Sequence, residues 1–266
     1  MKTKLLTRYS ARILVGVLAG GFFLYLGIPL ASLLLREPPS FLWTAMQQPD
    51  VFQALQLSLI TTTVSTIFTV LFGLPVAYVL ARRQFRGRGA LETLVTMPTV
   101  LPPVVAGVAL LLTFGRFGLI GRYLAPLGIT LPFTTFAVIM AQVFVSAPFF
   151  VNSAKAGLEQ LDTRYELAAY TLRASPFYTF RRVVLPLIRP ALLAGIGLSW
   201  ARALGELGAT ITFAGSFPGI TQTMPIAVYV AAQSDLDTAV AISVVLMAVS
   251  FGLLLALRLG RGRLSW

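Results

Sequence analysis

The residues LDTRYELAAYTLRASPFYTFRRVVLPLIRPALLAGIGLSWARALGELGATITFAG, numbered 161 to 215, decide how this chain folds. Their first part, residues 161–182, carries charges and turn-forming residues. The chain on both sides of it is apolar over stretches long enough to cross a bilayer. A polar surface therefore lies between two membrane spans, and we expect it to contact a partner.

The segment 161–182 contains two predicted helix starts. Thr163 followed three residues later by Glu166 matches a capping box, in which hydroxyl and carboxylate each accept a bond from an unpaired amide. Ser175 before Pro176 matches a second N-cap with proline at the first helical position. We therefore expect two short helices with a sharp turn between them.

The first of these helices is predicted to have one apolar face. Tyr165, Ala168, Ala169 and Leu172 fall at helical spacing and form a stripe with two alanines at its centre. Glu166 is placed on the other side of the helix. We expect the stripe to face the partner.

The composition is that of a membrane protein. Of 266 residues, 57% are hydrophobic and 11% are charged, and the mean hydropathy is +0.84, whereas soluble domains carry about 25% charged residues. The expected fold is all-α and polytopic, with a first span and outer loop in residues 1–50 and a core in residues 51–266. About six transmembrane helices are predicted, over residues 13–35, 51–81, 93–115, 131–154, 185–213 and 238–257.

The basic residues predict the orientation. With the N-terminus inside, 17 of the 21 lysines and arginines lie on the cytoplasmic side. Arg36, Arg116 and Arg122 lie outside, and Arg202 lies within a span. The positive-inside rule thus predicts cytoplasmic N- and C-termini and a cytoplasmic segment 161–182. It also accounts for the net charge of +12 without a nucleic-acid partner.

The residue types that are missing exclude several kinds of chemistry. The sequence has no cysteine and no histidine, which excludes disulfides, thiolate chemistry and imidazole metal sites, and we expect no metal centre. It has no GxxxxGK[ST] phosphate loop. If ATP is used, another chain binds it.

Arg202 and Glu206 are the one pair of charges predicted at apolar depth. They are four residues apart and can pair on one helix face, and an unpaired charge there costs at least ~2.5 kcal/mol. Two interpretations are open. In the first, the pair fixes the packing of this helix or holds a gate shut. In the second, Arg202 faces a pathway and attracts an anion, and Ser199, Gly205 and Thr210 supply hydroxyls and space nearby.

Three prolines interrupt the third predicted span. Pro98, Pro102 and Pro103 rule out one straight helix, and irregular backbone at membrane depth requires protein or a water-filled cavity beside it. The segment 98–103 therefore lines a pathway or forms an interfacial helix start. A short dipping helix is expected at 226–232 in the last outer loop.

Several runs of residues resemble a known transporter family. Glu166, Ala168-Ala169, Ala174-Ser175-Pro176 and Val184-Leu185-Pro186 are similar to the EAA loop of ABC importer permeases, the cytoplasmic segment that docks on the ATPase subunit. The runs 201–210, 217–219 and 223–225 resemble the molybdate and tungstate branch, to which sulfate permeases are related.

This resemblance implies a function, partners and site residues. It implies a homodimeric permease of the inner membrane without a catalytic site or cofactor of its own, working by alternating access in membrane lipid. Two ATP-binding subunits would carry ATP and magnesium, and an external binding protein would deliver the anion. The ATPase-coupling residues would be Glu166, Ala168, Ala169, Leu172, Arg173, Ser175 and Pro176; the pathway or gate residues would be Ser199, Arg202, Gly205, Glu206 and Thr210.

Arg173 departs from the family pattern, which usually has glycine at this position. Glycine there would allow a positive φ, and arginine in that conformation would cost roughly 1 kcal/mol. Either the turn is reshaped or it tolerates a side chain.

Three alternative functions remain open. The first is the same machine for sulfate or thiosulfate. The second is a self-contained secondary transporter or channel, for which one membrane-embedded charge pair and about six spans are few. The third is a membrane assembly factor, which the resemblance disfavours.

Overall fold

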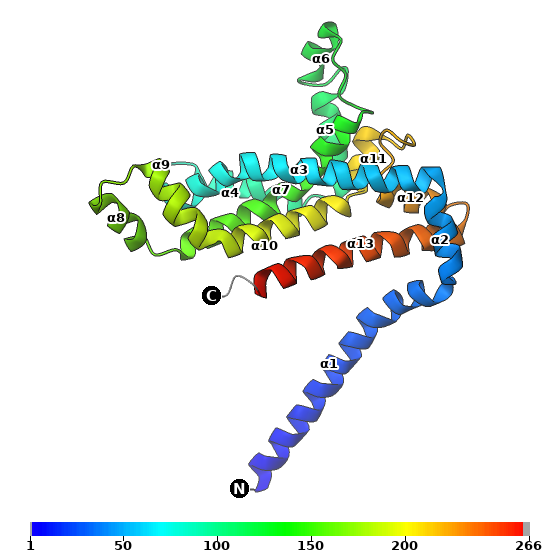
Figure 1. Cartoon of the computed structure of the whole chain (residues 1–266), viewed down its shortest axis with the longest axis horizontal. Coiled ribbons are helices and arrows are strands. Elements are labelled where there is room, and N and C mark those ends of the chain that lie inside the picture. Colours follow the sequence, from blue (N-terminus) through cyan, green and yellow to red (C-terminus); the bar gives the residue numbers. More distant parts are fainter. Residues whose placement is uncertain (1, 263–266) are drawn as a thin grey trace.

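The chain is a bundle of helices in a computed structural model that describes residues 2–262 (Figure 1). Within that range it contains no strand, which confirms the all-α prediction. Arg263, counted among the cytoplasmic charges, lies outside the described residues. The α-helices are α1 (Lys2–Arg36), α2 (Pro39–Gln47), α3 (Pro49–Arg82), α4 (Arg88–Thr96), α5 (Pro103–Phe114), α6 (Gly121–Leu124), α7 (Thr135–Gln160), α8 (Arg164–Thr171), α9 (Pro176–Thr179), α10 (Leu185–Leu204), α11 (Gly208–Ala214), α12 (Met224–Ala231) and α13 (Leu236–Gly262).

The helices agree with about six membrane spans. Five described helices are long and apolar enough to cross a bilayer. A sixth span is formed if Arg88–Thr99 and Pro103–Phe114 are counted together, although they are bent by 114°. The predicted break at the prolines is thus confirmed, because Pro102 and Pro103 separate the two halves.

Helices α3, α7 and α10 lie side by side and form the centre of the bundle (Figure 1). Small residues allow this close packing. A Cβ at Gly157 of α7 would lie 2.5 Å from the Cβ of Ala191 in α10, and one at Gly73 of α3 would lie 3.0 Å from the Phe150 ring in α7. Real Cβ contacts are longer, so glycine is required where these helices touch.

The hydroxyls of α3 bond within the helix and across to its neighbours. The Thr61 and Thr66 hydroxyls donate to carbonyls one turn earlier, each at 2.8 Å. Gln142 Nε2 of α7 donates to the Thr62 hydroxyl at 3.3 Å, and Trp200 Nε1 of α10 donates to that of Thr63 at 3.4 Å. The bonds from Gln142 and Trp200 join α3 to α7 and α10.

Two details of the predicted helix pattern were wrong. The stretch 36–50, expected as an outer loop, contains α2, which starts with Pro39 at its first position. The fifth span, expected to run through residue 213, ends at Leu204. The short helix expected near 226–232 is present as α12.

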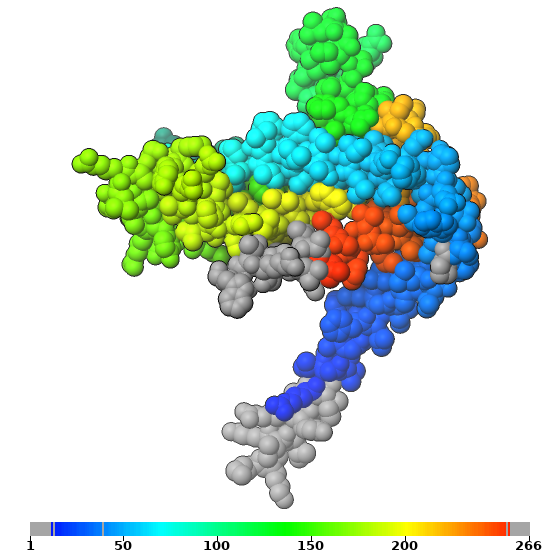
Figure 2. Space-filling view, in the orientation of Figure 1, coloured from blue at the N-terminus to red at the C-terminus, as the bar shows by residue number. Residues whose placement is uncertain are grey.

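Helix α1 stands away from the rest of the molecule (Figures 1 and 2). Every residue from Leu14 to Ser32 is exposed. At the end of the helix, Arg36 Nη2 lies 3.1 Å from Asp237 Oδ1 at the start of α13. An apolar helix exposed on all sides needs lipid or another protein surface around it.

Candidate functional site

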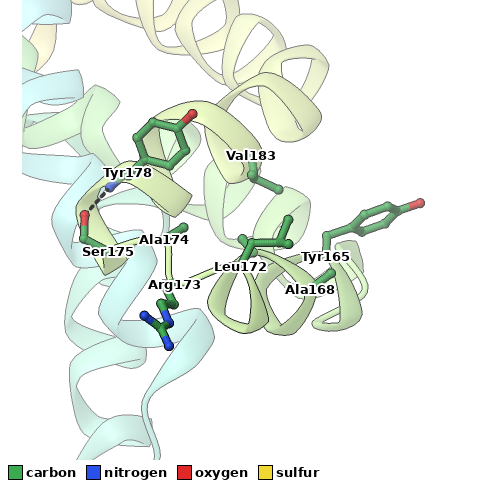
Figure 3. Close-up of a pocket in the computed structure, with 9 residues that line it drawn as sticks. Tyr165, Ala168, Leu172, Arg173, Ala174, Ser175, Tyr178 and Val183 are labelled. Carbon is green, nitrogen blue, oxygen red and sulfur yellow. Dashed lines mark hydrogen bonds between the residues drawn. The ribbon is translucent and has the colours of Figure 1, made fainter.

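The segment 161–182 forms two short helices around an open apolar hollow (Figure 3). The hollow has a volume of about 770 Å³. It is lined by Tyr165, Ala168, Ala169, Leu172, Arg173, Ala174, Ser175, Tyr178 and Val183. The predicted stripe of α8 therefore borders this hollow.

The stripe is open to solvent. Tyr165 is 55% exposed and Leu172 is 84% exposed. Ala168 is exposed and Ala169 is half-buried. A short helix that presents an apolar face to solvent has a surface that can be buried against another protein.

The predicted capping box is absent, and Glu166 has a different partner. Thr163 has helical φ and ψ of −61° and −17° and its side chain makes no cap hydrogen bond. Asp162 Oδ1 instead accepts from the Arg164 amide at 2.9 Å. Glu166 Oε1 lies 2.6 Å from Arg82 Nη2 at the end of α3. An ion pair between partly buried side chains adds charge–charge attraction that a bond from a carboxylate to a neutral amide lacks, which favours this orientation of the carboxylate.

The second predicted cap is confirmed. Ser175 Oγ accepts from the Tyr178 amide at 3.3 Å, and Pro176 occupies the first position of α9. After α9, residues 180–184 form a π-helical turn that continues into α10. π-helical turns are rare in proteins, and those that do occur are often found at functional sites.

Arg173 adopts the conformation that glycine would favour. Its φ is +60°, its amide donates to the Tyr170 carbonyl at 2.9 Å, and the Ala174 amide donates to that of Ala169 at 3.1 Å. These bonds close the end of α8. The turn is therefore kept and tolerates the side chain, at a cost of roughly 1 kcal/mol.

The second group of predicted residues lies where α10 breaks. Arg202 Nη1 is 2.7 Å from Glu206 Oε2, so the predicted ion pair is present. Glu206, however, lies beyond the end of the helix, after Gly205. It is 1% exposed, and its Oε1 accepts from the Ala209 amide at 2.8 Å. The carboxylate thus supports the start of α11, which explains why the span is not continuous.

Ser199 and Thr210 lie on either side of this break. Both are fully buried. Among the described residues neither hydroxyl has a hydrogen-bond partner. Buried hydroxyls without a hydrogen-bond partner are costly, so these two residues mark an unusual polar site beside the break. Gly205 is exposed at the break itself.

The break after α10 meets the proline break before α5. A Cβ at Gly208 would lie 2.7 Å from the Cβ of Pro103, and one at Gly107 would lie 2.6 Å from the Cβ of Thr212. Two interruptions far apart in the sequence are therefore packed against each other. No local sequence pattern predicts this contact, although Gly107 and Gly208 are the small residues that it needs.

A second ion network was missed from the sequence. Lys155 Nζ of α7 lies 2.8 Å from Glu92 Oε1 of α4, and Arg88 Nη2 lies 3.1 Å from Glu159 Oε1. Arg82 was also missed, because its role depends on Glu166, which lies far along the chain. The sequence analysis had used Lys155, Arg88 and Arg82 only to predict the membrane orientation.

Comparison with known proteins identifies the family. Residues 70–259 match the family model described as "Binding-protein-dependent transport system inner membrane component". The chain belongs to this family. The resemblance to ABC importer permeases is thereby confirmed, and the multi-pass membrane architecture agrees with it.

Individual relatives carry more specific names. The chain is 44% identical over 226 residues to the molybdenum transport system permease protein ModB of Mycobacterium tuberculosis, covering 85% of this chain and 86% of that one. It is 38% identical over 216 residues to the sulfate transport system permease protein CysT of Salmonella typhimurium, covering 81% and 78%. A crystal structure of a bacterial ABC transporter that imports alginate has the same fold, with a TM-score of 0.77, 16% identity and 99% coverage of both chains.

Proposed function

We propose that this chain is the transmembrane permease subunit of an ATP-driven importer of molybdate or tungstate. The observation that carries the proposal is the open apolar face of α8 beside the hollow, in a chain whose family depends on separate binding proteins. The choice of anion is supported by the 44% identity to a molybdenum permease.

The face of α8 is the proposed docking surface for the ATPase subunit. An alanine-centred stripe lets another protein approach closely, and Leu172 at 84% exposure offers an apolar contact. ATP and magnesium are held by that subunit, and this chain has no catalytic role. The distribution of the basic residues supports a cytoplasmic position for this surface, and we propose the inner membrane as the location of the protein.

The paired breaks are the proposed pathway and gate. Pro103 and Gly208 bring two helix interruptions together, and the Arg202–Glu206 pair closes the adjacent turn. When ATP closes the ATPase dimer, the docking helices are drawn together and the interruptions separate. In the open state Arg202 offers positive potential to an oxyanion, while Glu206 keeps the resting site neutral.

The functional unit is a homodimer. Helix α1, exposed from Leu14 to Ser32, supports this because it leaves the bundle instead of packing on it. An external binding protein delivers the anion and supplies the tight, selective binding that a pathway must avoid.

Sulfate is the second candidate substrate, supported by the 38% identity to a sulfate permease. The test is reconstitution of this chain in proteoliposomes with its ATPase subunit and its binding protein. We expect that uptake of labelled molybdate requires ATP and the binding protein. Tungstate should compete with this uptake, and sulfate should not. If sulfate competes and tungstate does not, the substrate is sulfate and not molybdate. Uptake driven by an ion gradient without ATP would overturn the proposal.

A further inference from the structure

The last residue of α3 forms an ion pair with the docking helix. Arg82 Nη2 lies 2.6 Å from Glu166 Oε1, and the two side chains are only 14% and 12% exposed. The same Nη2 lies 3.5 Å from the carbonyl oxygen of Leu161, the residue that follows the end of α7. One guanidinium therefore joins the ends of two long helices to α8.

The final turns of α3 are also packed against the segment that follows α8. The Tyr78 and Phe180 rings meet edge to face, with centroids 5.3 Å apart. Leu80 is buried in a cluster that includes Leu158 of α7 and Val184 of the π-helical turn. The end of α3 is thus held by apolar contacts on one side and by the ion pair on the other.

Helix α8 makes few other interactions that would make it move together with α3. Each of its residues keeps part of its surface exposed, so apolar burial holds it weakly. An ion pair with little solvent around it is stronger and more directional than one at an open surface. Among the described residues, the pair between Arg82 and Glu166 is the one ion pair that links α8 to α3.

Helix α3 extends from this tie to the far end of the bundle. Its residues Pro49–Arg82 span about 50 Å at 1.5 Å per residue. Toward its other end, Ser58 Oγ accepts from the Met224 amide of α12 at 2.7 Å. A displacement of α8 that reaches Arg82 is therefore carried by one element to α12.

We propose that Arg82 is a positioning residue, and that its pair with Glu166 transmits the movement of the docked α8 to α3. This inference rests on the proposed function, because the movement comes from the ATPase subunit. The expected defect is loss of coupling, in which ATP is hydrolysed without anion uptake.

The experiment compares charge variants in the reconstituted complex. Arg82→Gln and Glu166→Gln are each expected to lower uptake per ATP hydrolysed by about fivefold or more, with the ATPase subunit still co-purifying. The double neutral variant should lose no more than either single variant, since both remove one interaction. The exchange Arg82→Glu with Glu166→Arg should restore most of the coupling. Arg83→Gln, at the exposed neighbouring position, is the matched control and should couple normally.

Two results would overturn the inference: normal coupling in Arg82→Gln, or an exchange variant as defective as the single ones. If Arg82→Gln does not accumulate in the membrane, the exchange variant decides alone. Failure of the proposed function is distinguishable, because the unaltered protein would then show no ATP-dependent anion uptake.

Discussion

Gly208 packs against Pro103 so closely that a Cβ on the glycine would lie 2.7 Å from the Cβ of the proline. This contact joins the break that follows α10 to the break that precedes α5. The two interruptions can move relative to one another only if the contact opens. It is therefore the place where the gating proposal is most sensitive to small changes.

Adding a methyl group at this contact should impair both stability and transport. Gly208→Ala forces Pro103 or Val104 to shift, and such overpacking costs about 1–3 kcal/mol. We expect a lower thermal unfolding temperature in detergent and several-fold slower uptake. Gly252→Ala in α13 is the control, because a Cβ there meets nothing within 4 Å. Equal effects of the two substitutions would count against a special role for the contact.

Arg202→Gln should slow anion uptake while leaving the ATPase subunit bound. The substitution also leaves Glu206 buried without its partner, which alone costs about 3–5 kcal/mol. The double variant Arg202→Gln with Glu206→Gln removes this cost. If Arg202 acts on the anion, uptake stays slow in the double variant. If the pair only fixes packing, uptake returns, and the pathway role is refuted.

Ala168→Trp should uncouple ATP hydrolysis from transport. The indole fills the hollow beside α8 and blocks the approach of another protein to its face. Arg164→Trp is the matched control, since the Arg164 side chain is 89% exposed and does not line the hollow. Uptake and hydrolysis measured on the same proteoliposomes check the result, and coupled uptake in Ala168→Trp would show that the ATPase docks elsewhere.

Position 173 should accept glycine and reject a β-branched residue. At a φ of +60°, Arg173→Gly removes roughly 1 kcal/mol of backbone strain, and Arg173→Val adds strain because its branched Cβ clashes there. We expect higher thermal stability for the glycine variant, with uptake preserved, and lower stability for the valine variant. Loss of uptake in the glycine variant would mean that the arginine side chain itself makes a required contact.

Local sequence patterns were sufficient for much of this fold. Long uncharged stretches predicted the spans, because hydropathy depends on composition alone. The prolines at 98–103 predicted a break, since proline cannot continue a helix. Ser175 before Pro176 predicted a cap, because the bonding groups are neighbours in the chain.

Features that depend on distant residues were not predictable in the same way. Glu166 matched a local capping pattern, but Arg82 offered a stronger partner from another helix. Glu206 matched an i, i+4 pair, and the pair with Arg202 is present, but the pattern did not show that the helix ends at Leu204. Only in the case of Glu166 did a contact with a distant residue prevail over a local pattern.

The most direct test of the docking claim uses one cysteine in a chain that has none. Leu172→Cys is treated with a membrane-impermeant maleimide in right-side-out and inside-out vesicles, with and without the ATPase subunit. We predict labelling in inside-out vesicles only, and protection when the ATPase subunit is bound. Labelling from the outside, or labelling that the ATPase subunit does not reduce, would contradict the claim that this face of α8 is the cytoplasmic docking surface.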